Sequence, residues 1–191
     1  MGSDYRTNKI LGLIPKEVQT LLDVGSLGNI FNKRFKTTTL DAVEKADIQQ
    51  DLNKNQKLPF KDNSFDVVVM NQILEHLPDC EEIINEAKRV SRRYIFVGLP
   101  NELILSNRVR ILLGGFGTQY FTGYSKYDHK QFFVVKTIGD FIKRFFKKYE
   151  KKDYVFVGTF GNYLPKSLKD FLSKKIPTLF AGEVYYLIKV K

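Results

Sequence analysis

The sequence predicts an α/β fold: a doubly wound sheet of seven mostly parallel strands with helices on both faces. In the first hundred residues, strand-like runs alternate with helical patterns, and such an alternation implies parallel strands joined by right-handed crossovers. The run FDVVVM at 65–70 is apolar at consecutive positions, which is typical of a strand that is covered on both faces. Two further strand-like runs, at 153–160 and 183–191, would complete the sheet.

The first half of the chain contains five expected strands and two expected helices. The strand-like runs are apolar or rich in β-branched residues, and they lie at 20–25, 37–44, 46–53, 65–70 and 94–100. A helix is expected over 26–35, where Ile30, Phe31 and Phe35 have helical spacing. The second helix, over 80–93, has acidic residues in its first turn and arginines in its last, as the helix dipole favours.

The second half of the chain is less regular. A short helix is expected within 102–115, and the residues that follow are dense in Gly, Tyr and Phe. We expect residues 102–135 to form a lid or a pocket wall, because a long aromatic loop between ordered blocks is more often functional than filler. A last helix, begun by a proline, is expected over 165–175.

Residues 137–152 are expected to form an amphipathic helix with one apolar face and one lysine-rich face. This helix could cover the sheet or lie against a membrane surface. Packing of this helix against the sheet is favoured, because a seven-stranded sheet needs a covering helix at this position in the chain. The inward side chains would be those of Ile138, Phe141, Ile142, Phe145 and Phe146.

The length and composition favour one folded domain. The chain has 191 residues and 43% hydrophobic content, which suffices for a sizeable core, so residues 1–191 are expected to form a single domain. The N-terminus is polar and no window of about 18 uninterrupted apolar residues occurs, so neither a signal peptide nor a transmembrane segment is expected and the protein is expected to be cytoplasmic. The lone cysteine, Cys80, is expected to begin a helix. The sequence does not predict the oligomeric state.

The net charge of +10 is unevenly distributed. Residues 1–100 carry 14 basic and 14 acidic side chains, whereas residues 101–191 carry 17 basic and 7 acidic ones. A cationic half can attract phosphates, nucleic acid or an anionic membrane, and it can also be the solubilising face of amphipathic helices. Both interpretations stay open at this point.

The segment DVGSLGN, at 23–29, ends the first expected strand. A strand that ends in Asp and Gly before a helix is where a doubly wound sheet binds a nucleotide-like ligand, since the backbone comes close and the helix offers unpaired amides. Near the end of the second strand come Asp41 and Glu44, where an acidic side chain can accept both hydroxyls of a ribose. Each carboxylate alone could be a solvated charge, but the joint spacing favours ligand binding.

These features resemble the class I S-adenosylmethionine-dependent methyltransferases, and in particular their small type 11 group. The resemblance runs from about Leu21 to Pro100. It is carried by LLDVG in the first strand, Asp41 after the second, ADIQQDL in the third, and the block LPFKDNSFDVVVMNQILEHL at 58–77. This block is the most specific part, because few other folds have those residues in that order after an LDVG turn.

The resemblance implies a Rossmann-like methyltransferase fold that uses S-adenosylmethionine and releases S-adenosylhomocysteine. The methionine end of the cofactor would then lie over the turn at 23–29. Asp41 would hold the ribose hydroxyls, and Asp51 with Leu52 would face the adenine.

The resemblance also implies a role for the polar residues after the fourth strand. Asn71, Gln72 and Ile73 would line the slot beside the methyl-bearing sulfonium. Glu75 and His76 would begin the helix that walls this slot. The complete expected set of cofactor-binding residues is Asp23, Val24, Gly25, Ser26, Gly28, Asn29, Asp41, Asp51, Leu52, Asn71, Gln72 and Ile73.

The first turn departs from the family pattern, which usually has DxGxGxG. Gly25 is kept, but Leu27 and Asn29 stand at the second and third glycine positions, with Gly28 between them. Asparagine tolerates a positive φ, whereas leucine cannot allow the same close approach of the backbone. The domain is therefore an enzyme that binds the cofactor more weakly or through a differently shaped loop. Alternatively, it is a domain that has lost catalysis.

Methyl transfer to a good nucleophile needs in-line positioning rather than acid–base groups, so neither a metal nor a catalytic triad is expected. An oxygen nucleophile would need a base, and the candidate is His129 within the expected lid. His129 could instead pack in the lid or lie at the surface. For His76, capping and packing of a helix is favoured, because the LEH element recurs in this family across unrelated substrates.

The acceptor pocket is expected within 102–135. Basic and aromatic side chains of this segment suit an anionic or ring-bearing acceptor, such as a phosphorylated metabolite, a sugar nucleotide, a lipid-linked glycan or an exposed RNA base. They belong to Arg108, Arg110, Tyr120, Tyr124, Lys126, Tyr127, His129 and Lys130. No RNA-binding module is recognisable.

Two functions stay open. The first is a methyltransferase for a small or glycan-like acceptor. The second is a degenerate methyltransferase fold whose basic half binds nucleic acid or an acidic partner.

Overall fold

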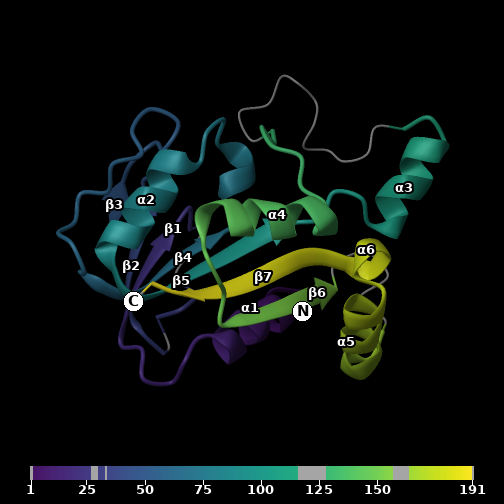
Figure 1. The fold of residues 1–191 in the computed structure, drawn as a ribbon, viewed down its shortest axis with the longest axis horizontal. Helices are drawn as coiled ribbons and strands as arrows, with labels where there is room; N and C mark the ends of the chain where they lie inside the picture. The colour runs from purple at the N-terminus through teal and green to yellow at the C-terminus, as the bar shows by residue number, and fades with distance from the viewer. Residues whose placement is uncertain (1, 27–29, 33, 116–127, 157–163, 191) are drawn as a thin grey trace.

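The computed structural model of the chain describes residues 2–26, 30–32, 34–115, 128–156 and 164–190. Within these residues, seven strands form one sheet in the order β3-β2-β1-β4-β5-β7-β6 (Figure 1). Helices lie on both faces of the sheet. The predicted doubly wound α/β fold with seven strands is therefore confirmed.

Five of the strands run parallel to one another. They are β1 (Thr20–Val24), β2 (Lys36–Asp41), β3 (Ile48–Gln49), β4 (Phe65–Asn71) and β5 (Ser91–Pro100). At the other end of the sheet, β7 (Ala181–Lys189) is antiparallel to both β5 and β6 (Lys151–Phe156). The strand order reverses between β1 and β4, and in open α/β sheets ligands bind at such a reversal, beyond the carboxyl ends of the strands.

The strand β4 is buried on both faces, as its continuous apolar run predicted. Val68 and Met70 pack on the face that is covered by α2 (Glu81–Val90) and α4 (Val135–Phe145). Val67 and Val69 pack on the opposite face, against the hydrophobic end of α1 (Gly2–Leu13). Figure 1 shows α2 and α4 in front of the sheet and α1 behind it.

The helix α4 covers the sheet, as expected of its apolar face. Ile138, Ile142 and Phe146 are buried in the core, and Phe141 and Phe145 are partly buried against it. These are the five side chains predicted to point inward. Among the described residues, none of the helices has the length and apolar composition that are needed to span a bilayer.

The helix α1 was not predicted from the sequence. Among its side chains whose burial the structure describes, from Tyr5 to Leu13, the buried ones are Ile10 and Leu13 in the last turns. The first half of the helix is mostly polar in sequence and has no apolar periodicity. Lys9 ties the helix to distant parts of the chain, because its Nζ lies 3.0 Å from Asp153 in β6 and 2.7 Å from Asp170 in α5 (Lys166–Lys175). Tertiary contacts thus stabilise a helix that local sequence does not specify.

The prediction of a helix over 26–35 is wrong for the residues that the structure describes. Residues 30–32, 34 and 35 form turns and bends. The side chains of Phe31 and Phe35 are buried, as their spacing suggested, but Ile30 is 46% exposed. Arg34 accounts for the turn, since its guanidinium donates hydrogen bonds to the carbonyls of Leu11, Ile14 and Pro15 and so anchors this segment to the end of α1.

Several boundaries also differ from the predictions. The expected strands 37–44 and 46–53 are shortened to β2 and β3, because the Asp47 carboxylate accepts hydrogen bonds from the N–H and the hydroxyl of Thr39 and holds the residues between in turns. The helix expected over 80–93 ends at Val90, and Ser91 already belongs to β5. Cys80 immediately precedes α2 and is buried, as expected of a structural cysteine. A short helix, α6 (Pro177–Phe180), was not expected.

Candidate active site

The carboxyl ends of β1, β2 and β4 meet at one edge of the sheet. Val24 is level with Leu40 of β2 and with Met70 of β4. One residue further, Asn71 is level with Gly98 of β5. The turn after β1, the end of β2 and the polar residues after β4 are therefore neighbours, as the order of the motifs predicted.

The turn after β1 depends on Gly25. Its φ is +78°, a conformation that side chains disfavour, and its N–H donates a hydrogen bond of 2.8 Å to the carbonyl of Leu40. A Cβ atom at this position would lie 2.6 Å from Cγ1 of Ile73, so only glycine allows the two segments to pack. The remaining loop residues singled out by the sequence, Leu27, Gly28 and Asn29, lie outside the described residues.

Two carboxylates interact at this edge. Asp23 is 5% exposed; burial raises its pKa to about 7, a hydrogen bond with Ser26 opposes the rise, and the charge of Asp41 adds to it. Asp41 ends β2 and is half-buried, and its Oδ1 accepts the N–H of Val43 at 3.2 Å. A ligand that brings hydroxyl donors or positive charge to this edge would stabilise both carboxylates.

The expected adenine-side residues lie just beyond β3. Asp51 accepts the N–H of Asn53 at 3.0 Å, and its Oδ2 lies 3.7 Å from Nζ of Lys54, so the carboxylate already holds the local turn. Leu52 is 5% exposed and packs in the core. Of the two residues, Asp51 is the one with solvent-accessible side-chain surface.

The residues after β4 carry unsatisfied polar atoms. Asn71 lies over Gly98, since a Cβ atom on that glycine would fall 2.1 Å from Asn71 Oδ1. Gln72 has a positive φ of 57°, and its N–H donates to the carbonyl of Gly98 at 3.0 Å. Among the described residues, the buried Oδ1 of Asn71 and Nε2 of Gln72 have no hydrogen-bond partner, although buried polar atoms nearly always have one.

These features fit a polar, nucleoside-bearing cofactor. A tight glycine turn allows its close approach, the Asp41 carboxylate can accept hydroxyl hydrogen bonds, and the unpaired atoms of Asn71 and Gln72 offer one acceptor and one donor at the same edge. The backbone strain at Gln72 is of the kind that persists where the surroundings or a ligand require it.

Glu75 and His76 were predicted to begin the helix that walls the slot, but no α-helix starts at these two residues. They belong to a single 3₁₀ turn, η1 (Leu74–His76), and α2 starts only at Glu81. Pro78 explains the break, because the residue before a proline is pushed out of the helical conformation. The turn nevertheless brings both side chains to the carboxyl edge of β4.

Glu75 is a buried carboxyl group at this edge. It is 1% exposed, and within the described part of the chain neither of its carboxylate oxygens has a hydrogen-bond partner. Burial raises the pKa of Glu75 to about 8, the residue's own backbone amide opposes the rise, and the charge of Glu102 adds to it.

His129, near the end of the insert at 102–135, lies close to Glu75 and His76. Its side chain is buried, and its Nδ1 lies 2.5 Å from Oε1 of Glu102, which is also buried and follows β5. The ring of His129 stands edge-on to that of His76, with 4.7 Å between centroids. The sequence singled out each histidine but not their pairing, and it missed Glu102.

The backbone fixes this arrangement. The carbonyl of Glu75 accepts the N–H groups of Lys130 and Gln131, at 2.6 and 3.1 Å. The side-chain amide of Gln131 donates to the carbonyl of Leu77 at 3.1 Å, and the N–H of Glu102 donates to the carbonyl of Phe133 at 2.9 Å. The end of the insert is thus held against both η1 and the segment after β5.

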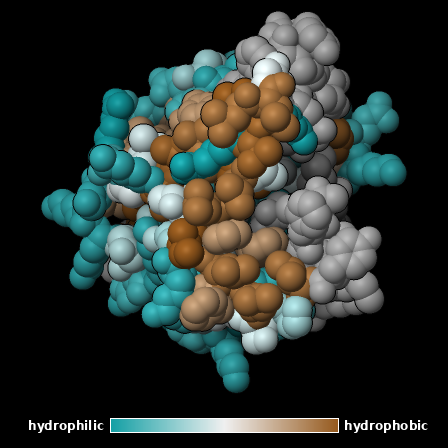
Figure 2. Space-filling view, turned by 90° about the vertical axis from the view of Figure 1, so that its right-hand side faces the viewer, coloured by the Kyte–Doolittle hydropathy of each residue, from teal (hydrophilic) through white to brown (hydrophobic). Residues whose placement is uncertain are grey.

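The described part of the insert contains a solvent-exposed helix of mixed polar and apolar residues. In α3 (Leu105–Leu112), no side chain is buried. The exposed large apolar side chains of α3 and of the residue after it are Leu105, Val109, Ile111, Leu112 and Leu113. Figure 2 shows hydrophobic surface on the side of the molecule at which α3 lies. Of the basic and aromatic residues expected to line an acceptor pocket, Tyr120, Tyr124, Lys126 and Tyr127 lie outside the described residues.

Comparison with known proteins agrees with this geometry. Residues 22–94 match the sequence model of a methyltransferase domain family. A solved S-adenosylmethionine-dependent methyltransferase from Archaeoglobus fulgidus has a TM-score of 0.62 at 15% identity, with 96% of this chain and 91% of that chain covered. A second one, from Thermotoga maritima, has a TM-score of 0.63 at 16% identity, with 98% and 88% covered.

A shorter match has higher identity. Over 51 residues, or 27% of this chain, the sequence is 42% identical to uncharacterized protein MJ1123 of Methanocaldococcus jannaschii. The matched segment spans 25% of that relative's own length.

Proposed function

We propose that this chain, which has the class I S-adenosylmethionine-dependent methyltransferase fold and a methyltransferase domain at 22–94, is an active methyltransferase. The observation that carries the proposal is the convergence of the Gly25 turn, the Asp41 carboxylate and the unpaired polar atoms of Asn71 and Gln72 at one sheet edge. A domain that had lost its cofactor would have no need to keep these buried polar atoms unsatisfied.

The family and the fold imply S-adenosylmethionine as the cofactor. When bound, it supplies a methyl group on a sulfonium, which is a strong electrophile. In our proposal Asp23, Val24, Gly25 and Ser26 support its methionine end together with Gly28 and Asn29, which follow in the sequence and lie outside the described residues.

The remaining cofactor contacts come from three other strands. Asp41 accepts the ribose hydroxyls, and Asp51 with Leu52 lies on the adenine side. Asn71, Gln72 and Ile73 line the slot beside the reacting methyl group, for which correct orientation contributes most of the rate.

The acceptor side is proposed to lie between η1 and the insert at 102–135. His129 is the residue there that can act on an acceptor hydroxyl, because it lies at this edge and Glu102 engages its Nδ1 and so orients the ring. The excess of basic side chains after residue 100, with the exposed Lys130 next to His129, supports a small anionic or glycan-like acceptor.

Isothermal titration with S-adenosylmethionine and S-adenosylhomocysteine tests the proposal. We expect saturable binding of both, which Asp41→Asn weakens by about tenfold or more through the loss of charge-assisted hydrogen bonds. The control is Glu44→Gln, which removes the same charge from an exposed side chain nearby and should leave the affinity within about twofold.

An alternative function would give a different result. If neither compound binds, while an RNA or another polyanion binds with an affinity that falls steeply with salt, the chain is a degenerate methyltransferase fold that uses its basic half for binding. If both compounds bind instead, the acceptor is identified by the release of S-adenosylhomocysteine in the presence of phosphorylated sugars, sugar nucleotides or short RNAs.

A further inference from the structure

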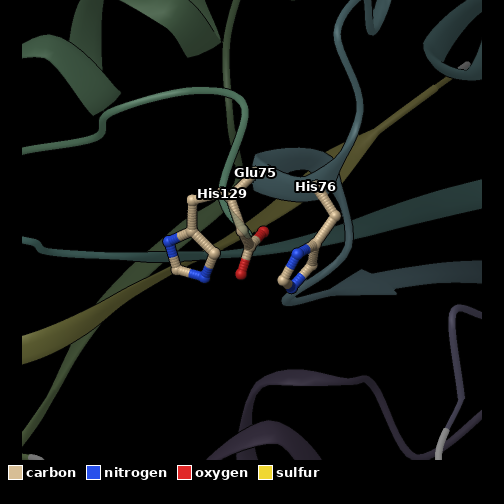
Figure 3. A group of neighbouring side chains, drawn as sticks. All are labelled: Glu75, His76 and His129. Carbon is tan, nitrogen blue, oxygen red and sulfur yellow. The ribbon is translucent and has the colours of Figure 1, made fainter. Parts of the chain in front are cut away.

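Three potential metal ligands gather at the acceptor side of the edge. One ligand atom each from Glu75, His76 and His129 lies within 4.8 Å of the other two. Figure 3 shows the carboxylate of Glu75 between the imidazole rings of the two histidines. These are the only two histidines in the chain, so its entire imidazole content lies in one cluster.

The distances suit a cation after a small adjustment. Ligand atoms bound to a transition metal at about 2.0–2.2 Å lie at most about 4.4 Å apart, and about 3.4 Å apart in a tetrahedral site. A separation of up to 4.8 Å therefore requires the three side chains to move together by about an ångström. Rotations about the side-chain bonds can supply such a shift without moving η1.

The carboxylate of Glu75 is the second and independent indication. It is buried, both of its oxygens lack a partner within the described part of the chain, and it points into the space between the two rings. A buried carboxylate without hydrogen bonds is unfavourable unless a proton or a cation neutralises it. A metal ion bound here would supply that charge.

Glu102 contacts His129 at the ring nitrogen that is further from Glu75. Its carboxylate lies 2.5 Å from Nδ1 of His129, and in Figure 3 the other ring nitrogen of His129 lies on the side of Glu75. A carboxylate on the far nitrogen is the usual partner of a metal-bound histidine, because it fixes the ring orientation and raises the basicity of the ligating nitrogen. Glu102 is thus a positioning residue for His129.

We propose that Glu75, His76 and His129 bind one divalent transition-metal cation, with Glu102 orienting His129. Two imidazole nitrogens and one carboxylate favour Mn²⁺, Fe²⁺, Co²⁺ or Zn²⁺ over Mg²⁺ and Ca²⁺, which prefer oxygen ligands. No metal was expected from the sequence, because only the fold brings the three ligands together.

The site would leave coordination positions open. With three protein ligands, at least one further position is available for water or for an oxygen of a bound molecule. If the proposed function holds, that oxygen belongs to the methyl acceptor, so the metal ion and not His129 acts on the acceptor hydroxyl, and a hydroxyl-bearing acceptor is the favoured class. The favoured acceptor class rests on the proposed methyltransferase activity, whereas the metal site itself does not.

Titration of metal-free protein with Co²⁺ tests the site directly. The protein is produced without a histidine tag and stripped with a chelator. We expect one Co²⁺ per chain, visible absorption bands typical of mixed nitrogen and oxygen ligands, displacement by Zn²⁺, and affinity for Mg²⁺ at least about a hundredfold weaker.

Substitutions assign the ligands. Glu75→Gln, His76→Gln and His129→Gln should each weaken Co²⁺ binding by more than about tenfold and change the absorption bands. Glu102→Gln should weaken binding by about ten- to a hundredfold while the bands of the saturated protein persist, as expected of a residue outside the coordination sphere. The control is Glu81→Gln, which changes an exposed carboxylate close by in the chain. It should alter neither the affinity for Co²⁺ nor the absorption bands.

The results separate this proposal from the proposed function. Absence of stoichiometric Co²⁺ and Zn²⁺ binding, or binding that survives the Glu75, His76 and His129 substitutions in proteins with native circular dichroism, overturns the metal site. Binding of S-adenosylmethionine by the metal-free protein is measured separately, so the loss of one property does not imply the loss of the other.

Discussion

Ile73 packs against Gly25 so closely that no side chain fits between them. A Cβ atom at Gly25 would lie 2.6 Å from Cγ1 of Ile73. The two residues follow different strands, β1 and β4, which are neighbours at the point where the strand order reverses. The contact therefore fixes the two halves of the candidate cofactor site relative to each other.

The first prediction concerns this contact. Gly25→Ala should lower the free energy of unfolding by about 1–3 kcal/mol, since alanine at φ +78° is strained and its Cβ must displace Ile73. Affinity for S-adenosylmethionine should fall as well, because the turn and the slot move apart. Chemical denaturation and calorimetric titration measure the two effects.

Gly139→Ala is the matched control for that substitution. Gly139 lies within α4, and a Cβ atom there meets nothing within 4 Å. Alanine should therefore raise the free energy of unfolding by about 0.5–1 kcal/mol through its higher helix propensity. Equal stability and equal cofactor affinity of Gly25→Ala and the unmodified protein would show that the contact has no role.

The second prediction uses the strained backbone of Gln72. Gln72→Gly should raise the free energy of unfolding by about 1 kcal/mol, because glycine adopts φ 57° without strain. The same change removes the unpaired Nε2, so affinity for S-adenosylmethionine should fall. Stability and binding thus move in opposite directions.

Asn63 provides a control with the same backbone conformation. Its φ is 56°, but it lies in an exposed turn before β4, at the amino end of that strand. Asn63→Gly should change stability by a few tenths of a kcal/mol, since asparagine tolerates this conformation better than most residues, and leave cofactor affinity unchanged. A Gln72→Gly protein that binds the cofactor as tightly as the Asn63→Gly protein would contradict our assignment.

The core of the fold could be predicted from the sequence because its strands are strongly patterned. The continuous apolar run of β4 requires cover on both faces, and Val67 and Val68 indeed face opposite hydrophobic clusters. The helix α1 could not be predicted, because its stabilisation depends on ion pairs such as that of Lys9 with Asp153, which are remote in sequence.

The candidate site likewise has one part that could be predicted from the sequence and one part that could not. Gly25, Asp41 and Asn71 directly end or follow strands, so strand order alone predicts that they meet. The pair of His129 and Glu102 depends on how the insert returns to η1, through backbone hydrogen bonds that no periodicity encodes. Function at the acceptor side therefore had to be inferred from the structure.

The third prediction concerns Arg89, which holds the LPFKD segment to α2. Its guanidinium donates to the carbonyls of Phe60 and Leu58, at 2.7 and 3.0 Å, and forms ion pairs with Glu86 and Asp62. Arg89→Lys cannot keep this set of bonds and should lower the free energy of unfolding by about 1–3 kcal/mol. Affinity for S-adenosylmethionine should stay within about twofold, because the network lies at the amino end of β4.

Arg93→Lys is the control for Arg89→Lys. Its pair with Glu17 is exposed and has a distance of 3.4 Å, and such surface pairs contribute between 0 and about 1 kcal/mol. Urea denaturation compares the two variants. If Arg89→Lys lowers the free energy of unfolding no more than Arg93→Lys does, the LPFKD segment is not held to α2 in the way that the structure indicates.

The fourth prediction is a pH dependence that arises from Asp23. Burial raises the pKa of its carboxyl group from 3.8 to about 7. Between these values the unfolded chain has lost this proton and the folded chain keeps it, so the contribution of Asp23 to the free energy of unfolding falls as the pH rises. Below about pH 4 the group is protonated in both states, and above about pH 7 it is ionised in both, so the contribution is constant in each range.

The substitution Asp23→Asn removes this titration, because an asparagine side chain cannot ionise, and the variant should therefore be more stable than the unmodified protein at neutral pH. The difference in the free energy of unfolding should grow from about pH 4 to about pH 7 and then level off, at no more than about 4 kcal/mol. Urea denaturation at intervals from about pH 4.5 to about pH 8.5 measures it, with the exposed Glu44→Gln as a control that should show no such trend. A difference between Asp23→Asn and the unmodified protein that does not vary over this range would mean that Asp23 is already ionised in the folded protein at acidic pH.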